Sequence, residues 1–274
     1  MHPIAFHLGS LAIHSYGVMM ALAFLAGLWT ATRRARLVQV PAEVISDITL
    51  WLMAGGIIGA RFVYVTTYWD QEFAGQPFSE VFMVQHGGLV YYGGFIGATL
   101  AGIGWLLWKK LPVWRVADVL APSIALGSMF GRIGCFLNGC CYGYECHMPW
   151  AVRFPEGHET HPYNHPAVPV HPTEIYDALL NLVLYILLAV LFRRRKFDGQ
   201  VFATYLMVYA VFRSISEAFR GDYPVDHLHA GLTSAHLVSV PIFVTGLGLG
   251  LFLARRPPTP LPPPPAGNGP QPGA

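Results

Sequence analysis

The sequence contains little charge for its length. Asp, Glu, Lys and Arg make up 12% of the 274 residues, and 54% of the residues are hydrophobic, whereas ordinary soluble domains carry about 25% charged residues. The formal net charge is only +2. This composition is typical of an integral membrane protein.

Signals for export and for soluble chemistry are also missing. Residues 1–15 lack the basic segment and the small-residue cleavage site of a signal peptide, so we expect them to remain on the mature protein. Alternating apolar residues on both sides of Gly9 and Ser10 favour a short hairpin or an interfacial arm there. The sequence has no internal repeat, glycine-rich phosphate-binding loop or soluble catalytic motif.

Apolar runs of about 20 residues, each long enough to cross a hydrocarbon core about 30 Å thick, fill nearly the whole chain. The sequence predicts seven such spans: Tyr16–Thr32, Ile45–Tyr68, Gly88–Trp108, Trp114–Leu137, Glu174–Phe192, Gln200–Phe219 and Ala235–Ala254. We therefore expect an all-α membrane protein with one membrane domain over residues 1–256. Residues 257–274 are so rich in proline that they predict a disordered tail.

The distribution of basic residues predicts the orientation, because Lys and Arg concentrate in cytoplasmic loops. Twelve of the 17 basic residues fall on one side of the predicted spans. They are Arg33, Arg34, Arg36, Lys109, Lys110, Arg115, Arg193, Arg194, Arg195, Lys196, Arg255 and Arg256. We expect the N-terminus outside, the C-terminus and its tail in the cytoplasm, and a small periplasmic segment at residues 140–172.

Isolated arginines inside the apolar runs are the first candidate site residues. Arg132 is the only charged residue between Asp118 and Glu145. A charged side chain in hydrocarbon costs at least about 2.5 kcal/mol, so it usually has a partner or a task; the alternative is an arginine that extends to the interface. Arg61 and Arg213 recur at a similar depth, about 20 to 27 Å along their spans. The same level is predicted for Tyr16, Tyr92 and His171.

The sixth predicted span places Arg213, Glu217 and Arg220 on one helix face, because they are spaced i, i+4 and i+7. Glu217 can pair with either arginine, and a self-neutralising ion pair is the alternative interpretation. Three arginines against one nearby carboxylate predict uncompensated positive charge, which an anionic ligand neutralises. The planar guanidinium suits phosphate, so the sequence predicts a phospholipid head group here.

The four cysteines, Cys135, Cys140, Cys141 and Cys146, lie within twelve residues. Their spacing differs from the usual zinc and iron–sulfur patterns, so we expect no metal and no cofactor. On an oxidising face the first expectation is a disulfide from Cys146 to Cys140 or Cys141. Buried free thiols and a nucleophilic cysteine are the open alternatives.

From about Ser10 to Arg220 the chain resembles the prolipoprotein diacylglyceryl transferase family. Six motifs in order support the resemblance: SYG from Ser15, GARFVY from Gly59, GGLVYYGGFIG from Gly87, GRIGCFLNGCCYG from Gly131, HPTEIYD from His171 and YAVFRSISEAFR from Tyr209. The resemblance implies a multi-pass enzyme of the bacterial cytoplasmic membrane. This enzyme transfers the diacylglyceryl group of phosphatidylglycerol to the lipobox cysteine thiol of a preprolipoprotein signal peptide and releases glycerol phosphate.

The resemblance also implies roles for individual residues. The family's essential arginine falls on Arg132, its sixth-helix arginine and glutamate on Arg213 and Glu217, its first-helix tyrosine on Tyr16 and its loop glycine on Gly143. The remaining expected phosphatidylglycerol contacts are Arg61, Asn138 and Arg220.

The chain departs from the family pattern at three positions. Tyr92 stands where the family commonly has histidine, and Cys135 and Cys140 replace an asparagine and a glutamate. Motif alignment selects Tyr92 over Tyr91, which we expect to pack among helices because helical neighbours lie about 100° apart. Either Tyr92 or His171 is expected to accept the proton of the substrate thiol.

Two other functions remain open at this point. A paralogue with the same fold and a different acceptor is motivated by the missing histidine and the cysteine cluster. A lipid- or anion-binding transporter predicts a water path to the cytoplasmic side, where the sequence places no intramembrane polar residue. For the transferase we expect a monomer whose partners are phosphatidylglycerol, preprolipoprotein signal peptides and membrane lipids, and no nucleic acid.

The first testable prediction is the topology. Reporters fused at Arg34, Lys110, Arg194 or Arg256 are expected to read as cytoplasmic, because basic residues flank these positions. A periplasmic signal from any of the four fusions contradicts the predicted orientation.

Overall fold

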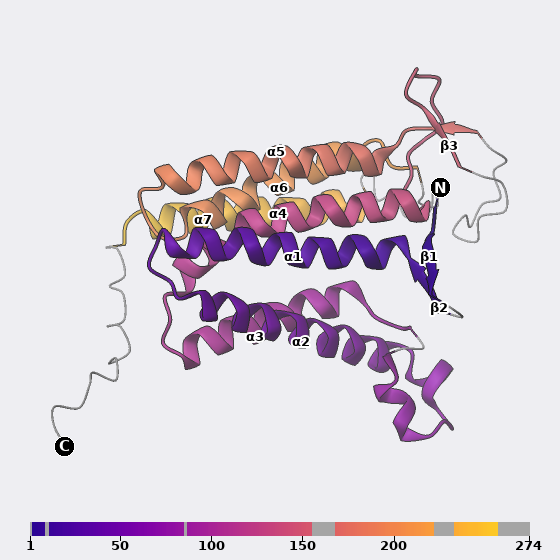
Figure 1. The fold of residues 1–274 in the computed structure, drawn as a ribbon, viewed down its shortest axis with the longest axis horizontal. Helices are drawn as coiled ribbons and strands as arrows, with labels where there is room; N and C mark the ends of the chain where they lie inside the picture. The colour runs from indigo at the N-terminus through magenta and orange to yellow at the C-terminus, as the bar shows by residue number, and fades with distance from the viewer. Residues whose placement is uncertain (1, 9–10, 85–86, 155–167, 222–232, 257–274) are drawn as a thin grey trace. The chain divides into compact units, whose positions relative to one another are not determined.

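The structure, a computed structural model, describes residues 2–8, 11–84, 87–154, 168–221 and 233–256. These residues form two compact units, which we describe separately (Figure 1). Unit 1 comprises Met1–Arg34 and Ala117–Pro258, and unit 2 contains Ala35–Val116. The predicted tail at residues 257–274 and much of the predicted periplasmic segment, residues 155–167, lie outside the described residues.

Each predicted span corresponds to one long helix. The seven helices are α1 (Ser15–Arg36), α2 (Ala42–Thr67), α3 (Tyr91–Trp108), α4 (Val113–Asn138), α5 (Thr173–Arg194), α6 (Gln200–Glu217) and α7 (Ser234–Leu253). Five of them, α1, α2, α4, α5 and α7, are long and apolar enough to cross a membrane. Helices α3 and α6 are the two shortest of the seven, with 18 residues each. The expected helical membrane protein is confirmed at this level.

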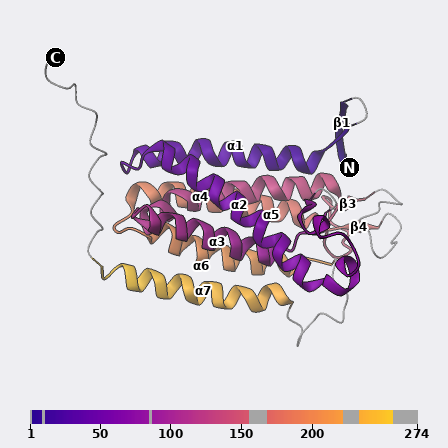
Figure 2. The same ribbon diagram turned by 90° about the horizontal axis from the view of Figure 1, so that it is seen from below.

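Unit 1 has a distinct end that carries its short strands. Strands β1 (Ile4–Leu8) and β2 (Leu11–His14) pair antiparallel and continue directly into α1, which confirms the expected hairpin. The end of α4 and the start of α5 lie at the same end of the unit, as Figures 1 and 2 show. Strands β3 (Val152–Arg153) and β4 (Pro169–Val170) also lie there. We call this part of unit 1 the hairpin end.

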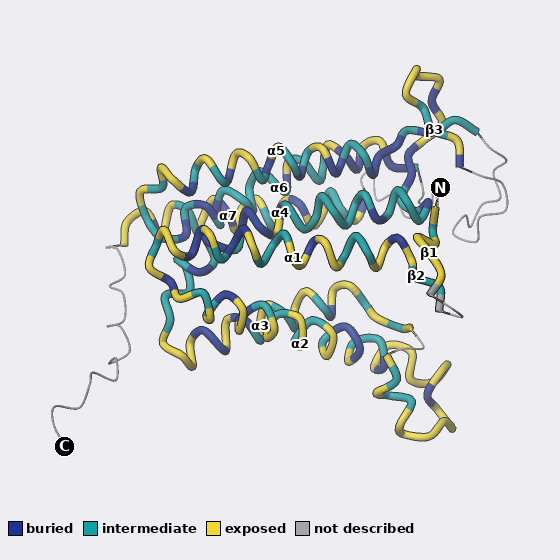
Figure 3. Tube along the Cα trace, viewed as in Figure 1, coloured by how far each residue is buried: buried dark blue, intermediate teal, exposed yellow. Residues whose placement is uncertain are grey.

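Helix α6 packs against both α5 and α7, and α4 bonds to α1 through the Thr30 and Ser123 hydroxyls, 2.9 Å apart. Exposed positions recur along these helices (Figure 3), and many of them are occupied by large apolar residues. Leu25 in α1 and Leu251 in α7 are 66% and 58% exposed. A continuous apolar surface of this kind fits contact with lipid rather than with water.

Arg34 departs from its predicted place in a cytoplasmic loop. Helix α1 continues to Arg36, so Arg34 lies within the helix and is buried. Its Nε donates to the Val119 carbonyl at 3.1 Å, and an Nη atom donates to the hydroxyls of Thr30 and Ser123. Because a buried guanidinium needs acceptors, these contacts with α4 explain why the helix extends this far.

A buried carboxylate organises the start of α6. Asp118 in α4 accepts hydrogen bonds from the backbone N–H groups of Gly199 at 2.8 Å and Phe202 at 2.9 Å. Gly199 precedes the helix with a positive φ of 93°. The first N–H groups of a helix have no partner within it, so Asp118 satisfies them from a neighbouring helix. The negative charge of its carboxylate also interacts favourably with the positive end of the α6 dipole.

In unit 2, α2 and α3 approach closely through glycines. A Cβ atom at Gly97 would lie 2.9 Å from the Cα atom of Gly59, and one at Gly59 would lie 2.8 Å from the Cα atom of Gly97. Small residues allow such backbone contact between membrane helices. The glycines of both predicted spans therefore serve packing here.

Replacing Asp118 is expected to destabilise unit 1. Asp118→Ala leaves two buried N–H groups of α6 unpaired and is expected to lower the free energy of unfolding by about 1–3 kcal/mol; Asp118→Asn, which keeps one acceptor, is expected to lose less. Thermal unfolding in detergent measures this effect. The exposed Asp47→Ala is the control, and an Asp118→Ala variant as stable as that control contradicts the role.

Candidate active site

The hairpin end of unit 1 holds an arginine from the end of α4. Arg132 Nε lies 2.9 Å from Asp177 Oδ2 in the second turn of α5, and both side chains are largely buried. Arg132 is also close enough to Arg220 to interact with it electrostatically. The sequence analysis missed Asp177, although it is the acidic residue one turn into the apolar α5 run.

The polar face predicted for the sixth span is confirmed as an ion-paired group. Arg213 Nη2 lies 2.7 Å from Glu217 Oε2, and Arg220 Nη1 lies 3.7 Å from the same oxygen. The Glu217 side chain is fully buried. Because one carboxylate contacts both guanidinium groups, it fixes their separation along the helix.

The predicted excess of positive charge is reduced, because two carboxylates and not one pair with the three arginines of the hairpin end. The sequence analysis counted one carboxylate near three arginines, but Asp177 pairs with Arg132 while Glu217 pairs with Arg213 and Arg220. Glu174 is a further buried carboxyl in the first turn of α5. Arginines buried in an apolar bundle need carboxylate partners, and these partners come from helices that are remote in sequence.

Three chain segments meet at Gly143. Its N–H donates to the His171 carbonyl at 2.9 Å, and it forms a β-bridge with Arg220. The Tyr144 N–H donates to the Phe219 carbonyl at 3.0 Å. A Cβ at Gly143 would lie 2.5 Å from the Phe219 oxygen, so a larger residue cannot fit without moving the backbone. This junction ties the loop after α4 to the start of α5 and the end of α6.

His171 lies beside this junction in an aromatic group. Its Nδ1 is 3.1 Å from the Tyr176 hydroxyl, to which Trp150 Nε1 donates at 2.7 Å. The His171 ring also meets the Phe219 ring edge-on, with centroids 5.5 Å apart. These contacts fix the orientation of the imidazole.

Tyr16 and Asn138 lie next to the cysteines. Tyr16, 42% exposed in the first turn of α1, interacts electrostatically with Arg132 and with the thiols of Cys135, Cys140 and Cys141. The Asn138 side chain hydrogen-bonds to Cys140. Both predicted site residues are thus brought to the cysteine cluster.

Arg61 and Tyr92 belong to unit 2. Arg61 is buried, and its guanidinium donates to the backbone carbonyls of Glu80, Val81, Gly87 and Gly88 at 2.6–3.2 Å. These bonds fix the position of the segment between α2 and α3. The sequence analysis did not predict this role for Arg61.

Tyr91 and Tyr92 are both exposed, by 75% and 59%, and their rings meet edge-on. Within the described residues of unit 2 no helix covers either ring, so the expectation that Tyr91 packs among helices is not met there.

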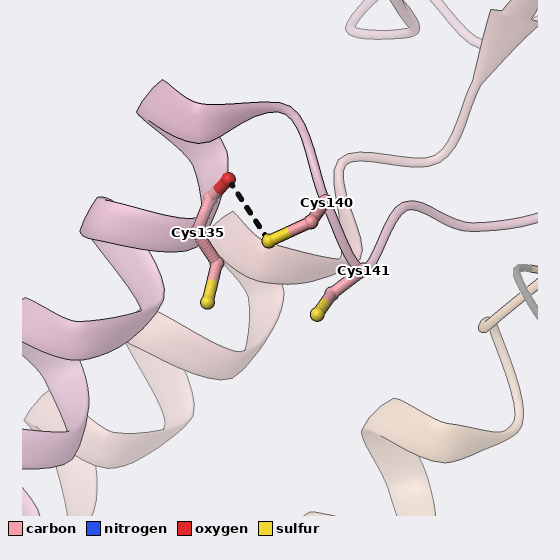
Figure 4. Close-up of side chains that lie close together, drawn as sticks. All are labelled: Cys135, Cys140 and Cys141. Atoms are coloured by element: carbon pink, nitrogen blue, oxygen red, sulfur yellow. Dashed lines mark hydrogen bonds between the residues drawn. The ribbon is translucent and has the colours of Figure 1, made fainter. Parts of the chain in front are cut away.

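The cysteines form a group that spacing did not reveal. The sulfur atoms of Cys135, Cys140 and Cys141 all lie within 4.8 Å of one another (Figure 4). Hydrogen bonds from the Cys135 and Cys141 thiols lower the pKa of the Cys140 thiol below its ordinary value. The sequence does contain a signal for this cluster, namely Asn138 followed by Gly139. A glycine after the last helical residue reverses the chain direction, so the residues that follow it return to the last turn of the helix.

The expected disulfide was wrong. All four cysteines are free thiols. Cys146 is buried and its N–H donates to the Pro169 carbonyl at 2.9 Å, so it belongs to the strands beyond the junction rather than to the cluster.

The fold and the site define a multi-pass membrane protein with an arginine–carboxylate centre at one end of its helices. A model described as prolipoprotein diacylglyceryl transferase matches residues 3–252. Relatives named phosphatidylglycerol–prolipoprotein diacylglyceryl transferase include one from Finegoldia magna, 31% identical over 90% of this chain and 94% of its own length. One from Geobacter sulfurreducens is 33% identical over 89% and 92%, and one from Agrobacterium fabrum is 34% identical over 89% of each chain. The chain belongs to the prolipoprotein diacylglyceryl transferase family.

Proposed function

We propose that this protein transfers the diacylglyceryl group of phosphatidylglycerol to the lipobox cysteine thiol of preprolipoproteins. The observation that carries the proposal is the match to relatives named for this reaction over nearly their whole length. The arginine–carboxylate centre supports it, because the reaction has to bind and release a phosphate.

The reaction is the alkylation of sulfur. The thiolate attacks the glyceryl carbon, a carbon–sulfur bond forms, the carbon–oxygen bond to phosphate breaks, and its electron pair stays on the phosphate oxygen. Arg132 and Arg213 stabilise the charge that develops on this leaving group. Since Asp177 and Glu217 already compensate most of the positive charge of the three arginines, the clamp depends on the directed hydrogen bonds of the guanidinium groups more than on net charge.

Supporting roles follow from the contacts at the hairpin end. Glu217 and Asp177 orient the arginines through their ion pairs. The lipid head group is further contacted by Arg220, Tyr16 and Asn138, and Gly143 shapes the backbone next to it. Tyr92 or His171 accepts the thiol proton. Arg61, whose donors engage backbone carbonyls, acts as a scaffold residue instead of the lipid contact predicted from sequence.

The protein is proposed to span the bacterial cytoplasmic membrane seven times as a single membrane domain, with the hairpin end towards the periplasm. One observation supports this orientation. In unit 1, Arg33, Arg193 and Arg255 lie in or just beyond the last turns of α1, α5 and α7, at the ends remote from the hairpin, which is the side expected in the cytoplasm. The proposed substrates, a phospholipid and an exported signal peptide, are both reached from the membrane. We propose that the enzyme acts as a monomer.

Complementation tests the proposed function. The full-length chain is expected to restore growth and lipoprotein modification in a bacterium whose own diacylglyceryl transferase is switched off. A chain that reaches the membrane but leaves prolipoproteins unmodified contradicts the proposal and favours a paralogue with another acceptor.

Lysine variants test the arginine clamp. Arg132→Lys and Arg213→Lys are each expected to lower turnover by roughly 10²-fold, because a point charge does not reproduce the planar, two-pronged donor. Turnover is measured with purified enzyme, phosphatidylglycerol and a lipobox peptide. The exposed Arg193→Lys is the matched control. Near wild-type turnover in both clamp variants refutes the clamp.

A tyrosine pair tests the proton acceptor. Tyr92→Phe is expected to lower turnover by roughly 10²-fold, since it removes a hydroxyl that takes part in proton transfer. Tyr91→Phe is the neighbouring control and is expected to have a mild effect. Equal, small effects from both variants leave the proton to His171 or to the field of the arginines alone, and His171→Gln then separates these two alternatives.

A further inference from the structure

Three sulfur atoms meet at the hairpin end in an arrangement that suits one metal ion. Those of Cys135, Cys140 and Cys141 lie within 4.8 Å of one another, and Figure 4 shows them around a shared space. Zinc–sulfur bonds of about 2.3 Å place three sulfurs roughly 4 Å apart around one ion. Rotamer adjustments smaller than about 1 Å therefore convert the cluster into a three-thiolate site.

The backbone holds this arrangement in place. Gly139 and Cys141 adopt positive φ angles of 83° and 74°, and the Cys140 N–H donates to the Cys135 carbonyl at 3.2 Å. The Thr173 hydroxyl donates to the Cys141 carbonyl at 2.6 Å. A non-glycine residue at positive φ is costly, and such strain persists where the surrounding structure enforces it. The three thiols are thus positioned by α4, by its terminal turn and by α5.

Charge and hydrogen bonding around the cluster also suit a metal. Three thiolates and one divalent ion together carry a single negative charge. The positive charge of Arg132 lies near this negative charge, because Arg132 precedes Cys135 by one helical turn and interacts electrostatically with Cys135 and Cys141. The Asn138 side chain hydrogen-bonds to Cys140, as second-layer residues do around metal ligands.

We propose that Cys135, Cys140 and Cys141 bind one Zn²⁺ ion, and that its fourth coordination position takes the acceptor thiol. Thiolates are preferred ligands of zinc, and three protein ligands with one open position are the pattern of catalytic zinc sites. The inference rests on the proposed function, in which a cysteine thiol becomes the nucleophile. It replaces the expectation, drawn from cysteine spacing alone, that the chain binds no metal.

The chemistry balances without an oxidant or a reductant. The substrate thiol loses its proton when it binds zinc, because a coordinated thiol is deprotonated; the proton acceptor of the proposed function passes that proton to water. The zinc-bound sulfur then forms the bond to the glyceryl carbon while glycerol phosphate leaves with the electron pair of the broken carbon–oxygen bond. The product thioether is neutral, so it binds zinc weakly and dissociates. Cys135 lies one turn after Arg132 on α4, so the metal site and the phosphate clamp share one helix.

Metal binding is measured on the purified full-length protein in detergent. Wild-type protein is expected to bind one Zn²⁺ per chain, and one Cd²⁺ with sulfur-to-metal charge-transfer absorption of three thiolates. Cys135→Ser, Cys140→Ser and Cys141→Ser are each expected to abolish stoichiometric binding. Cys146→Ser, which changes a free thiol outside the cluster, is the matched control and is expected to retain it.

Substrate binding provides a readout that needs no variant and no turnover. A lipobox peptide added to the Cd²⁺-loaded wild type is expected to raise the charge-transfer absorption by one further thiolate, whereas the same peptide with serine for cysteine is expected to leave it unchanged. Binding that survives all three cluster variants, a disulfide within the cluster, or an unchanged spectrum with the cysteine peptide overturns the proposal.

Activity separates this inference from the proposed function. Metal-free enzyme is expected to lose transfer, and Zn²⁺ is expected to restore it. A metal-free enzyme that still transfers the diacylglyceryl group overturns the zinc site and leaves the transferase intact. An enzyme that binds zinc but transfers nothing even when loaded contradicts the transferase instead.

Discussion

A charge inside an apolar helical bundle has to find its partner within the protein, and this constraint organises the structure. Asp177 pairs with Arg132, and Glu217 pairs with Arg213 and Arg220. Asp118 in turn satisfies the backbone at the start of α6. Each contact joins elements that lie far apart in the sequence or fixes two side chains along one helix. Because an unpaired buried charge costs several kcal/mol, these pairs determine which helices face one another as strongly as apolar packing does.

The helices themselves could be predicted because their signal is local. An apolar run of sufficient length specifies a helix whatever its neighbours are, so all seven appear within a few residues of the predicted ends. The spacing of Arg213, Glu217 and Arg220 likewise fixes a common face from within one helix. The ends of the helices were predicted less accurately than their existence. A buried contact such as the one between Arg34 and Val119 extends α1 beyond its apolar run.

The candidate site was predicted less completely, because depth along a helix does not say which helices are neighbours. Arg61 and Tyr92 were assigned to the site by depth, yet Arg61 engages the carbonyls of its own unit. Asp177 was missed because its partner lies 45 residues away, as their sequence numbers show. The pairing of Cys146 failed for the same reason: the turn at Gly139 carries the first three cysteines together, while the strands beyond it hold the fourth.

The junction at Gly143 has a consequence for biosynthesis. It closes only when the loop after α4, the carbonyl of His171 and the carbonyl of Phe219 are all in place. The ribosome therefore has to deliver six helices before the last of these bonds can form, and contacts of such long sequence separation form late. The nascent chain remains without an assembled reaction centre during most of its insertion, so it cannot alkylate exported thiols before its first six helices are in place.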